Sequence, residues 1–211
     1  MRRVLPPAFR RTLRLVVVFA VMANVPCADA QEWSFGLSGF LFDPPNESAY
    51  FSPIFDADRE ALHLETRYNY ENLKTASAFV GWNLETGDEV VLSATPMFGF
   101  VFGETNGVAP GLELDIAWRA LEFYSESEVV FDFESSEDSF LYAWIETTAA
   151  PVEWLHAGIV AQKTETYQTG LEIQRGLMAE LTYDAWSLGS YWFNPDRSKD
   201  DLFVFALGYE F

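Results

Sequence analysis

The side chains best suited to chemistry in this sequence are two histidines and a large excess of carboxylates. The only histidines are His63 and His156, and the only cysteine is Cys27. A zinc site needs more imidazole or thiolate ligands than these residues supply, and no loop has the ligand spacing of a calcium-binding EF-hand. No Gly-x-Ser-x-Gly element accompanies either histidine. We therefore expect no catalytic residue, no metal site and no cofactor, and we interpret both histidines as hydrogen-bonding groups.

Many of the carboxylates stand at every second position of otherwise apolar segments. Glu113 and Asp115, for example, alternate with Leu112, Leu114 and Ile116. Because successive side chains of a β-strand point to opposite faces, this pattern requires one face in water and one in an apolar medium. The same alternation predicts a set of water-facing, solute-contacting residues that would line the lumen of a barrel: His63, Glu65, Arg67, Glu113, Asp115, Glu122, Glu126, Glu146, His156 and Glu172.

The elements that carry these residues are predicted to be strands, because period two runs through almost the whole chain and period 3.6 is nearly absent. Clusters of turn residues, such as 43–46 and 194–196, divide the pattern. The predicted strands are 33–42, 49–55, 60–70, 75–84, 89–102, 109–117, 120–133, 139–149, 153–163, 170–183, 185–194 and 201–211. Pro53 interrupts the weakest of them, and losing that strand with a neighbour would give ten strands.

The lengths of these segments predict a membrane barrel. After residue 30 no segment reaches 18 uninterrupted apolar residues, which excludes a spanning helix. Several predicted strands have about ten to fourteen residues, enough to cross a bilayer at a tilt. In lipid, only a closed barrel pairs the backbone groups of every strand. We predict an all-β fold, a transmembrane antiparallel up-and-down β-barrel of twelve strands with both termini on the periplasmic side. The less favoured alternative is a soluble, secreted, carbohydrate-binding β-sandwich.

The first thirty residues have the composition of a secretory signal peptide. Five arginines precede an apolar run over 15–25, and small residues follow at 28–30. We expect cleavage before Gln31, which leaves a signal peptide, 1–30, and an outer-membrane β-barrel domain, 31–211. Without the leader the chain has 8 basic and 31 acidic side chains, a net charge of −23. Such a charge repels phosphates, so we expect no nucleic-acid partner.

Aromatic residues collect at one set of predicted strand ends. Trp and Tyr favour the membrane–water interface, because part of the ring system prefers oil and part prefers a hydrogen bond. If the first strand runs outward, these ends are the periplasmic ones. The predicted periplasmic aromatic girdle is Trp33, Trp82, Trp118, Trp154, Tyr183, Trp186, Tyr209 and Phe211. Trp154 fits less well than the others, because the same count gives it inward parity.

The last predicted strand has large apolar groups at every second position and ends on an aromatic residue. These residues are Phe203, Phe205, Leu207, Tyr209 and Phe211. The pattern resembles the terminal-strand signal of Gram-negative outer-membrane proteins, which the barrel-assembly machinery reads. The resemblance implies the bacterial cell outer membrane as the location, and its lipids and that machinery as partners. Small twelve-stranded proteins of this kind include solute channels and one phospholipase class, so it implies architecture better than activity.

The acidic water-facing set predicts a function. An acidic passage with low-dielectric walls concentrates cations and repels anions. We therefore expect a porin-like channel for passive passage of small, preferentially cationic solutes. In the competing interpretation the charges form hydrogen-bonded pairs, such as Arg67 with Glu65, and fill the interior of a non-conducting structural barrel.

Arg175 conflicts with the strand pattern. It has lipid-facing parity in the predicted strand 170–183, where an arginine at the membrane midplane costs about 2–4 kcal/mol. We expect either that its side chain extends to the outer rim or that a bulge near Gly176 shifts the register.

Overall fold

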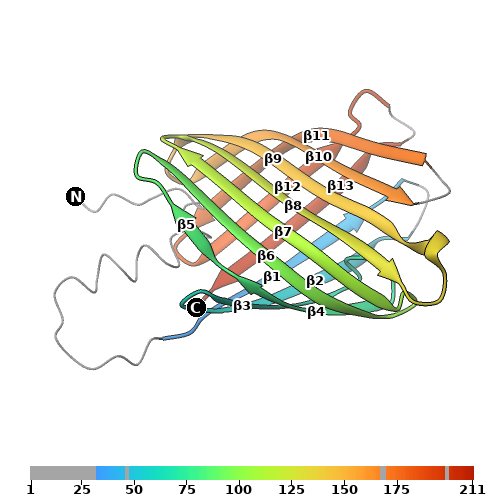
Figure 1. The fold of residues 1–211 in the computed structure, drawn as a ribbon. Coiled ribbons are helices and arrows are strands. Elements are labelled where there is room, and N and C mark those ends of the chain that lie inside the picture. Colours follow the sequence, from blue (N-terminus) through green and yellow to red (C-terminus); the bar gives the residue numbers. More distant parts are fainter. Residues whose placement is uncertain (1–31, 46–47, 167–169, 198–199) are drawn as a thin grey trace.

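The protein is described from a computed structural model, which covers residues 32–45, 48–166, 170–197 and 200–211. The described residues form one antiparallel sheet that closes on itself (Figure 1). Its strands are β1 (Ser34–Asp43), β2 (Tyr50–Arg59), β3 (Leu62–Tyr68), β4 (Thr75–Trp82), β5 (Leu84–Thr86), β6 (Val90–Gly103), β7 (Gly107–Trp118), β8 (Leu121–Asp132), β9 (Phe140–Val152), β10 (Leu155–Thr166), β11 (Gly170–Tyr183), β12 (Trp186–Phe193) and β13 (Leu202–Glu210). The predicted signal peptide and its cleavage site lie outside the described residues.

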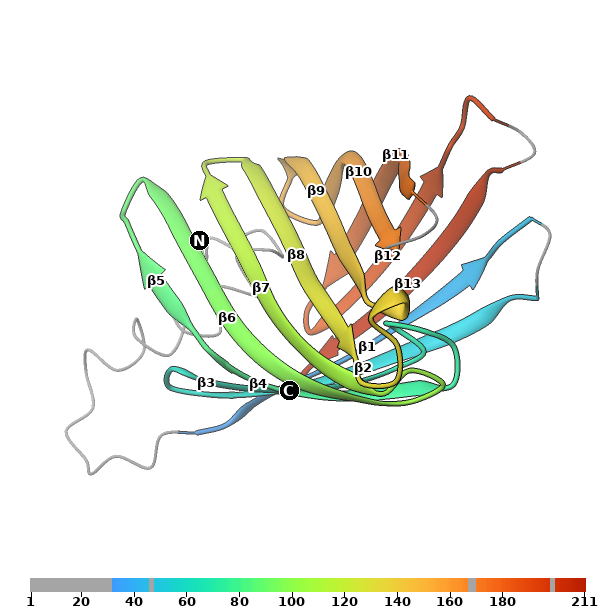
Figure 2. The ribbon, with the colours of Figure 1, turned by 45° about the vertical axis from the view of Figure 1, so that its right-hand side comes forward.

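Twelve of these strands make the wall of the barrel. Each is paired with two neighbours: β13 pairs with β1, and β4 pairs with β6, which joins the two ends of the strand order. The three-residue β5 pairs with β6 beside this wall. The predicted twelve-strand antiparallel barrel is therefore confirmed, and the curvature of the wall is visible in Figure 2. One short 3-10 turn, Ser136–Asp138, follows β8, and no helix among the described residues is long and apolar enough to cross a membrane.

Pro53 and Pro96 do not break their strands, because each lies where pairing with a neighbouring strand is missing. Pro53 is paired with Gly39 of β1, while β3 begins to pair with β2 only at Ile54. Pro96 lies in a gap of the β6 pairing. The pairing of β6 with β5 ends at Ala94, and the pairing of β6 with β4 begins at Met97. A proline without an N–H group is tolerated at such edges and irregularities. The weakest predicted strand therefore exists, and it runs past Pro53.

Two further prolines lie beside irregularities of the strand pairing. The β7–β8 ladder is interrupted beside Pro110, and the β9–β10 register shifts near Pro151. The predicted turn at 150–152 is wrong, since β9 continues to Val152 and the turn is formed by Glu153 and Trp154. The inward parity predicted for Trp154 is wrong for the same reason. Its side chain lies in that turn and is 57% exposed.

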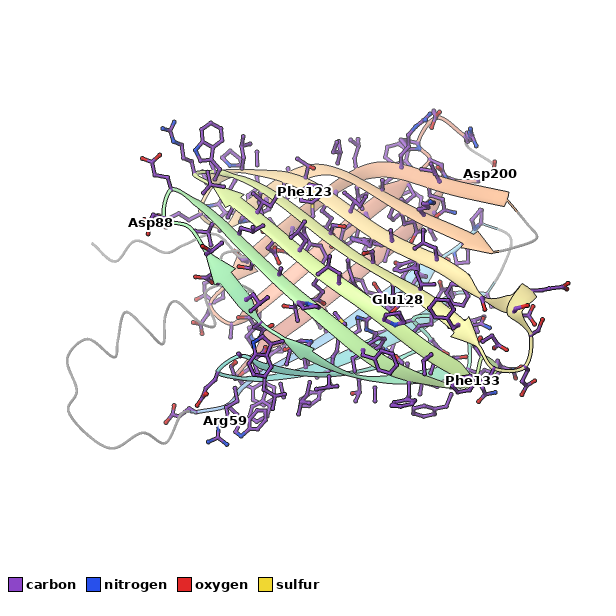
Figure 3. All side chains as sticks on the ribbon, in the orientation of Figure 1. Arg59, Asp88, Phe123, Glu128, Phe133 and Asp200 are labelled. Carbon is purple, nitrogen blue, oxygen red and sulfur yellow. The ribbon has the colours of Figure 1, made fainter. Side chains whose placement is uncertain are left out.

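The two ends of the barrel differ. We call the end with Trp33 and Phe211 the terminal end and the opposite one the loop end. At the terminal end, four pairs of strands are joined by two-residue turns. Three of these turns begin with a residue in the left-handed region, which lets the chain reverse within two residues. The connections at the loop end are longer. In Figure 3 the side chain of Arg59 lies at the terminal end, and that of Phe133 lies at the loop end.

The outer face of the wall is apolar. Phe203, Phe205 and Leu207 of the terminal strand point outward and are exposed. All eight residues of the predicted girdle belong to the terminal end: Trp33, Trp82, Trp118, Trp154, Tyr183, Trp186, Tyr209 and Phe211. Large exposed apolar side chains surround a barrel only where the surroundings are themselves apolar.

Arg175 lies on this outer face without a bulge. The β10–β11 register is continuous across it, from Ala161 opposite Arg175 to Val160 opposite Gly176. On the other side of β11, β12 ends at Phe193, the partner of Gly176. Arg175 is therefore level with the loop end of β12. Its guanidinium donates to Asp196 at 2.9 Å in the following loop. The expectation that Arg175 reaches the rim is therefore confirmed, and the alternative of a bulge is wrong.

Candidate functional site: the barrel lumen

Nine of the ten residues that alternation predicts to face water point into the barrel. Eight of them line a single cavity: His63, Glu65, Glu113, Asp115, Glu122, Glu126, Glu146 and His156. Arg67 is buried beside them, with 3% of its surface exposed. The side chain of Glu172 lies outside the described part of the molecule. Contact of any of these residues with a solute stays a prediction.

The cavity, which we call the vestibule, has a volume of about 210 Å³ and reaches the terminal end beside Glu85 and Glu210. Its lining is strongly acidic. Eleven carboxylate side chains contribute to it: Asp56, Asp58, Glu65, Glu85, Glu113, Asp115, Glu122, Glu126, Glu146, Glu180 and Glu210. No Lys or Arg belongs to the described lining, and His63 and His156 are its basic members. Among the described residues, acidic side chains therefore far outnumber basic ones in the lining of the vestibule.

Some of these carboxylates are placed directly opposite each other on neighbouring strands. Asp56 of β2 is paired with Glu65 of β3, and Glu113 of β7 is paired with Glu126 of β8. Like charges in such cross-strand pairs destabilise a sheet. The arrangement costs stability, and a cation between the carboxylates would offset that cost.

One guanidinium stands at the deep end of the vestibule. Arg67 donates to Glu65 through Nε, and its Nη1 lies 2.6 Å from Glu126 and 3.4 Å from Glu128. Glu71 is 4.0 Å away. All four carboxylates are at least nine-tenths buried as side chains. One guanidinium therefore serves four acidic side chains at this end of the vestibule.

Aromatic rings hold the same guanidinium in place. Its central carbon lies 4.6 Å from the ring centre of Tyr70 and 4.5 Å from that of Phe79. Such contacts stabilise a cation by attraction to the negative ring faces. The Tyr70 hydroxyl also donates to Glu126 at 3.1 Å, and its ring packs edge-on against Tyr142. Arg67 is thus fixed by charge and by packing.

Tyr70 and Glu71 belong to the connection between β3 and β4, which is the loop-end turn that folds into the lumen. The Glu71 side chain is fully buried, and its carboxylate accepts a hydrogen bond from Ser77 at 2.5 Å. Burial raises the pKa of this Glu71 carboxyl. Because β3 and β4 are only seven and eight residues long, their connection reaches the interior at the level of Arg67. Sequence reasoning missed this inward turn.

A hydrogen-bond chain lies on the vestibule wall near the terminal end. Asp58 accepts from His63 Nδ1 at 2.8 Å and from Asn83 at 2.7 Å. The Asn83 amide oxygen in turn accepts from Thr95 at 2.7 Å. These bonds fix the imidazole of His63 against the wall. Within the described ranges, no three His, Cys, Asp or Glu side chains are grouped so that they could hold a metal ion.

The loop-end half of the lumen is filled by apolar side chains, which we call the plug. Phe193, Val130 and Val204 have no exposed surface. The plug consists of two buried clusters: Phe42, Tyr124, Trp144, Val160, Met178, Tyr191, Phe193, Leu202 and Val204, and Phe79, Met97, Val101, Ala109, Val130 and Phe140. Five plug residues also line the vestibule, namely Phe42, Tyr124, Trp144, Met178 and Tyr191. The vestibule therefore ends on the plug.

An apolar outer face, a largely polar vestibule and full closure define the architecture of this molecule as that of a porin-like outer-membrane β-barrel. No family model matches the chain, and no curated protein matches it. Among solved structures it is similar to the KdgM porin, with 12% identity and a TM-score of 0.57 over 83% of this chain and 99% of that chain. It is also similar to the outer-membrane protein Omp33 of Acinetobacter baumannii, with 10% identity and a TM-score of 0.50 over 87% and 100%. At these identities the likeness establishes the fold.

Proposed function

We propose that the protein is an outer-membrane channel that takes small cationic solutes into the acidic vestibule and passes them through the barrel. The observation that carries the proposal is the lining of the vestibule, eleven carboxylates with no Lys or Arg among the described residues. Such a lining raises the local concentration of cations and repels anions. No catalytic role is proposed for His63 or His156.

In this proposal the terminal end faces the periplasm. An even number of strands leaves both ends of the described chain on one side, and short turns belong to the periplasmic side of outer-membrane barrels. The exposed aromatic residues of the same end would lie at the periplasmic membrane–water interface of the outer membrane. The barrel-assembly machinery would recognise the outward-facing side chains of the last strand, Phe203, Phe205 and Leu207.

Passage through the whole barrel requires movement in the loop-end half. The turn that carries Tyr70 and Glu71 is the element we expect to move, because it crosses the lumen between two short strands. Tyr70 and Glu71 hold it by hydrogen bonds and ring contacts, and Asn69 and Asn72 donate to the Phe51 carbonyl and to Thr105. These side-chain contacts can break without unpairing the wall. The packed plug also favours a second candidate function, a non-conducting structural barrel with a vestibule on the periplasmic side.

Recording from planar bilayers tests the proposal. We expect small currents from the folded protein, with a reversal potential in a KCl gradient that indicates cation preference. The variant Tyr70→Ala should conduct more, because it removes the contacts with Glu126 and Arg67. A matched control is Tyr68→Ala, whose ring points outward and whose current should equal that of the parent. Anion preference would contradict the proposal, and the absence of current from every variant would favour the non-conducting barrel.

A further inference from the structure

The floor of the vestibule contains aromatic rings set nearly at right angles. Trp144 packs against Tyr191 with ring centres 5.2 Å apart and planes at 77°, and against Phe40 at 6.4 Å and 65°. All three residues line the vestibule. The three rings form a corner at the floor of the vestibule, where Trp144 is 5% and Tyr191 is 4% exposed. The faces of aromatic rings attract organic cations, above all Trp faces in a site shielded from water.

Polar groups surround the same corner. The Trp144 Nε1–H donates to Glu146 at 2.6 Å, which holds both the ring and the carboxylate in place. Nearer the terminal end, Glu180 of β11 is paired with His156 of β10. Glu180 lies two residues beyond Met178, the partner of Tyr191, and His156 lies six residues from Gln162, the partner of Trp144. His156 is only 3% exposed, it lines the vestibule, and its Nε2 has no hydrogen-bond partner among the described residues. A buried polar atom without a partner is costly, and a ligand that hydrogen-bonds to it would remove the cost.

We propose that this corner, formed by Phe40, Trp144 and Tyr191 with Glu146, Glu180 and His156, binds the alkylammonium group of a small organic cation. The carboxylates supply charge, the rings cover the methylene groups, and the imidazole nitrogen accepts a hydrogen bond from the ammonium. The inference rests on the proposed function, because it names the class of solute that the same vestibule would take.

Size and chemistry favour an organic cation over an inorganic one. The volume of about 210 Å³ is below the roughly 300–1,000 Å³ of pockets for drug-sized ligands. Calcium and magnesium prefer a complete shell of oxygen ligands, and the floor of the vestibule is made largely of ring carbon. An alkylammonium ion keeps its charge near the carboxylates while its carbon atoms contact the rings.

Titration calorimetry on the full barrel, folded in detergent, tests the inference. The probe is 1,5-diaminopentane, which is compared with the neutral diol of equal length, 1,5-pentanediol, and with ammonium chloride. We expect the diamine to bind with a dissociation constant at least about tenfold lower than either comparison compound. The diol lacks the charge that the carboxylates would bind, and ammonium lacks the methylene groups that the rings would contact. Each compound therefore tests one part of the proposed recognition.

Two variants locate the site. Glu180→Gln removes one charge and should weaken diamine binding about tenfold. Trp144→Phe keeps a ring at the corner and should weaken binding less, which separates recognition from folding. Glu60→Gln, in an exposed turn of the terminal end, is the matched control and should leave binding unchanged.

The outcomes separate the inference from the channel proposal. Equal binding of diamine and diol would overturn the inference, and so would diamine binding that neither Glu180→Gln nor Trp144→Phe weakens. Cation-selective current without diamine binding would overturn the inference and leave the channel proposal standing. Diamine binding without current would support the inference and contradict passage through the barrel.

Discussion

The two halves of the lumen are built on opposite principles. The terminal-end half is a vestibule with eleven carboxylates, some of them directly opposite one another. The loop-end half is a plug whose central residues, such as Phe193 and Val204, are completely buried. Both halves are enclosed by the same twelve strands, so the backbone does not cause the difference. It comes from the residues at inward parity alone.

The comparison indicates how the molecule divides its tasks. Burial of apolar side chains stabilises a fold, while unneutralised carboxylates in one cavity destabilise it. The plug therefore supplies packing stability that the acidic vestibule does not. Arg67 stands where the halves meet, with carboxylates on one side and the ring of Phe79, a plug residue, on the other. Changes at this boundary should have the largest effects.

Replacing Arg67 should therefore destabilise the barrel most. Arg67→Met leaves Glu65, Glu126 and Glu128 without their cation, and the loss of one partner from a buried ion pair costs about 3–5 kcal/mol. We expect a decrease of that size in the free energy of unfolding, measured by urea titration in detergent. Arg119→Met is the control, because Arg119 lies exposed in a turn of the terminal end. An equal loss of stability in both variants would contradict a special role for Arg67.

The contribution of the plug can be measured at two neighbouring positions of β11. Met178 points inward and is 6% exposed, whereas Leu177 points outward and is 53% exposed. Met178→Ala should lower the free energy of unfolding by about 2–5 kcal/mol, because it leaves a cavity in packed surroundings. Leu177→Ala should cost much less, since detergent or lipid fills the space that it leaves. Similar losses for both would show that the plug is loosely packed.

The wall of the barrel could be predicted from the sequence, because one face of each strand meets lipid. Where water-facing charges alternate with apolar residues, as at Glu113 and Asp115, the period assigns each side chain to a face. The strand through Pro53 was the weakest prediction. The pairing of β3 with β2 starts only at Ile54, so Pro53 needs no N–H group to bond to β3. The sequence alone does not reveal where this pairing starts.

The plug could not be predicted by the same method, because alternation disappears where both faces are apolar. The runs 40–42, Phe-Leu-Phe, and 191–193, Tyr-Trp-Phe, hold large apolar residues at consecutive positions. Such runs indicate that the inner face is dry, and they were the available signal. The inward turn at Tyr70 and Glu71 had no local signal, since its direction depends on the short lengths of β3 and β4.

Removing one carboxylate from the vestibule should raise the free energy of unfolding, whereas the change in the plug lowers it. At a pH where both carboxyls are ionised, Glu113→Gln relieves the like-charge pair with Glu126, and cross-strand pairs of this kind contribute about 0.2–1 kcal/mol. We expect the free energy of unfolding to rise by that amount, while cation preference in bilayer recordings falls. Glu89→Gln, exposed in the turn before β6, is the control and should change neither quantity. A loss of stability in Glu113→Gln would mean that this carboxylate holds the wall together.

The smallest effect is expected outside both halves, at the Arg175–Asp196 contact of the loop end. The pKa of Asp196 lies below the ordinary value of 3.8, because its own backbone N–H and the Arg175 guanidinium donate to the carboxylate. A carboxyl with a lowered pKa in the folded state adds stability above its unfolded pKa and loses it as pH falls further. The contribution should thus be present at neutral pH, begin to fall near pH 4 and be lost as the pH falls through the lower pKa of the folded state. Because the pair is exposed to solvent, the change should be small compared with that of any lumen variant. Titration of Asp196 by NMR in detergent, with Arg175→Gln as the comparison, measures it directly. The variant should move the pKa of Asp196 upward, and an unchanged pKa would mean that the backbone N–H alone sets it.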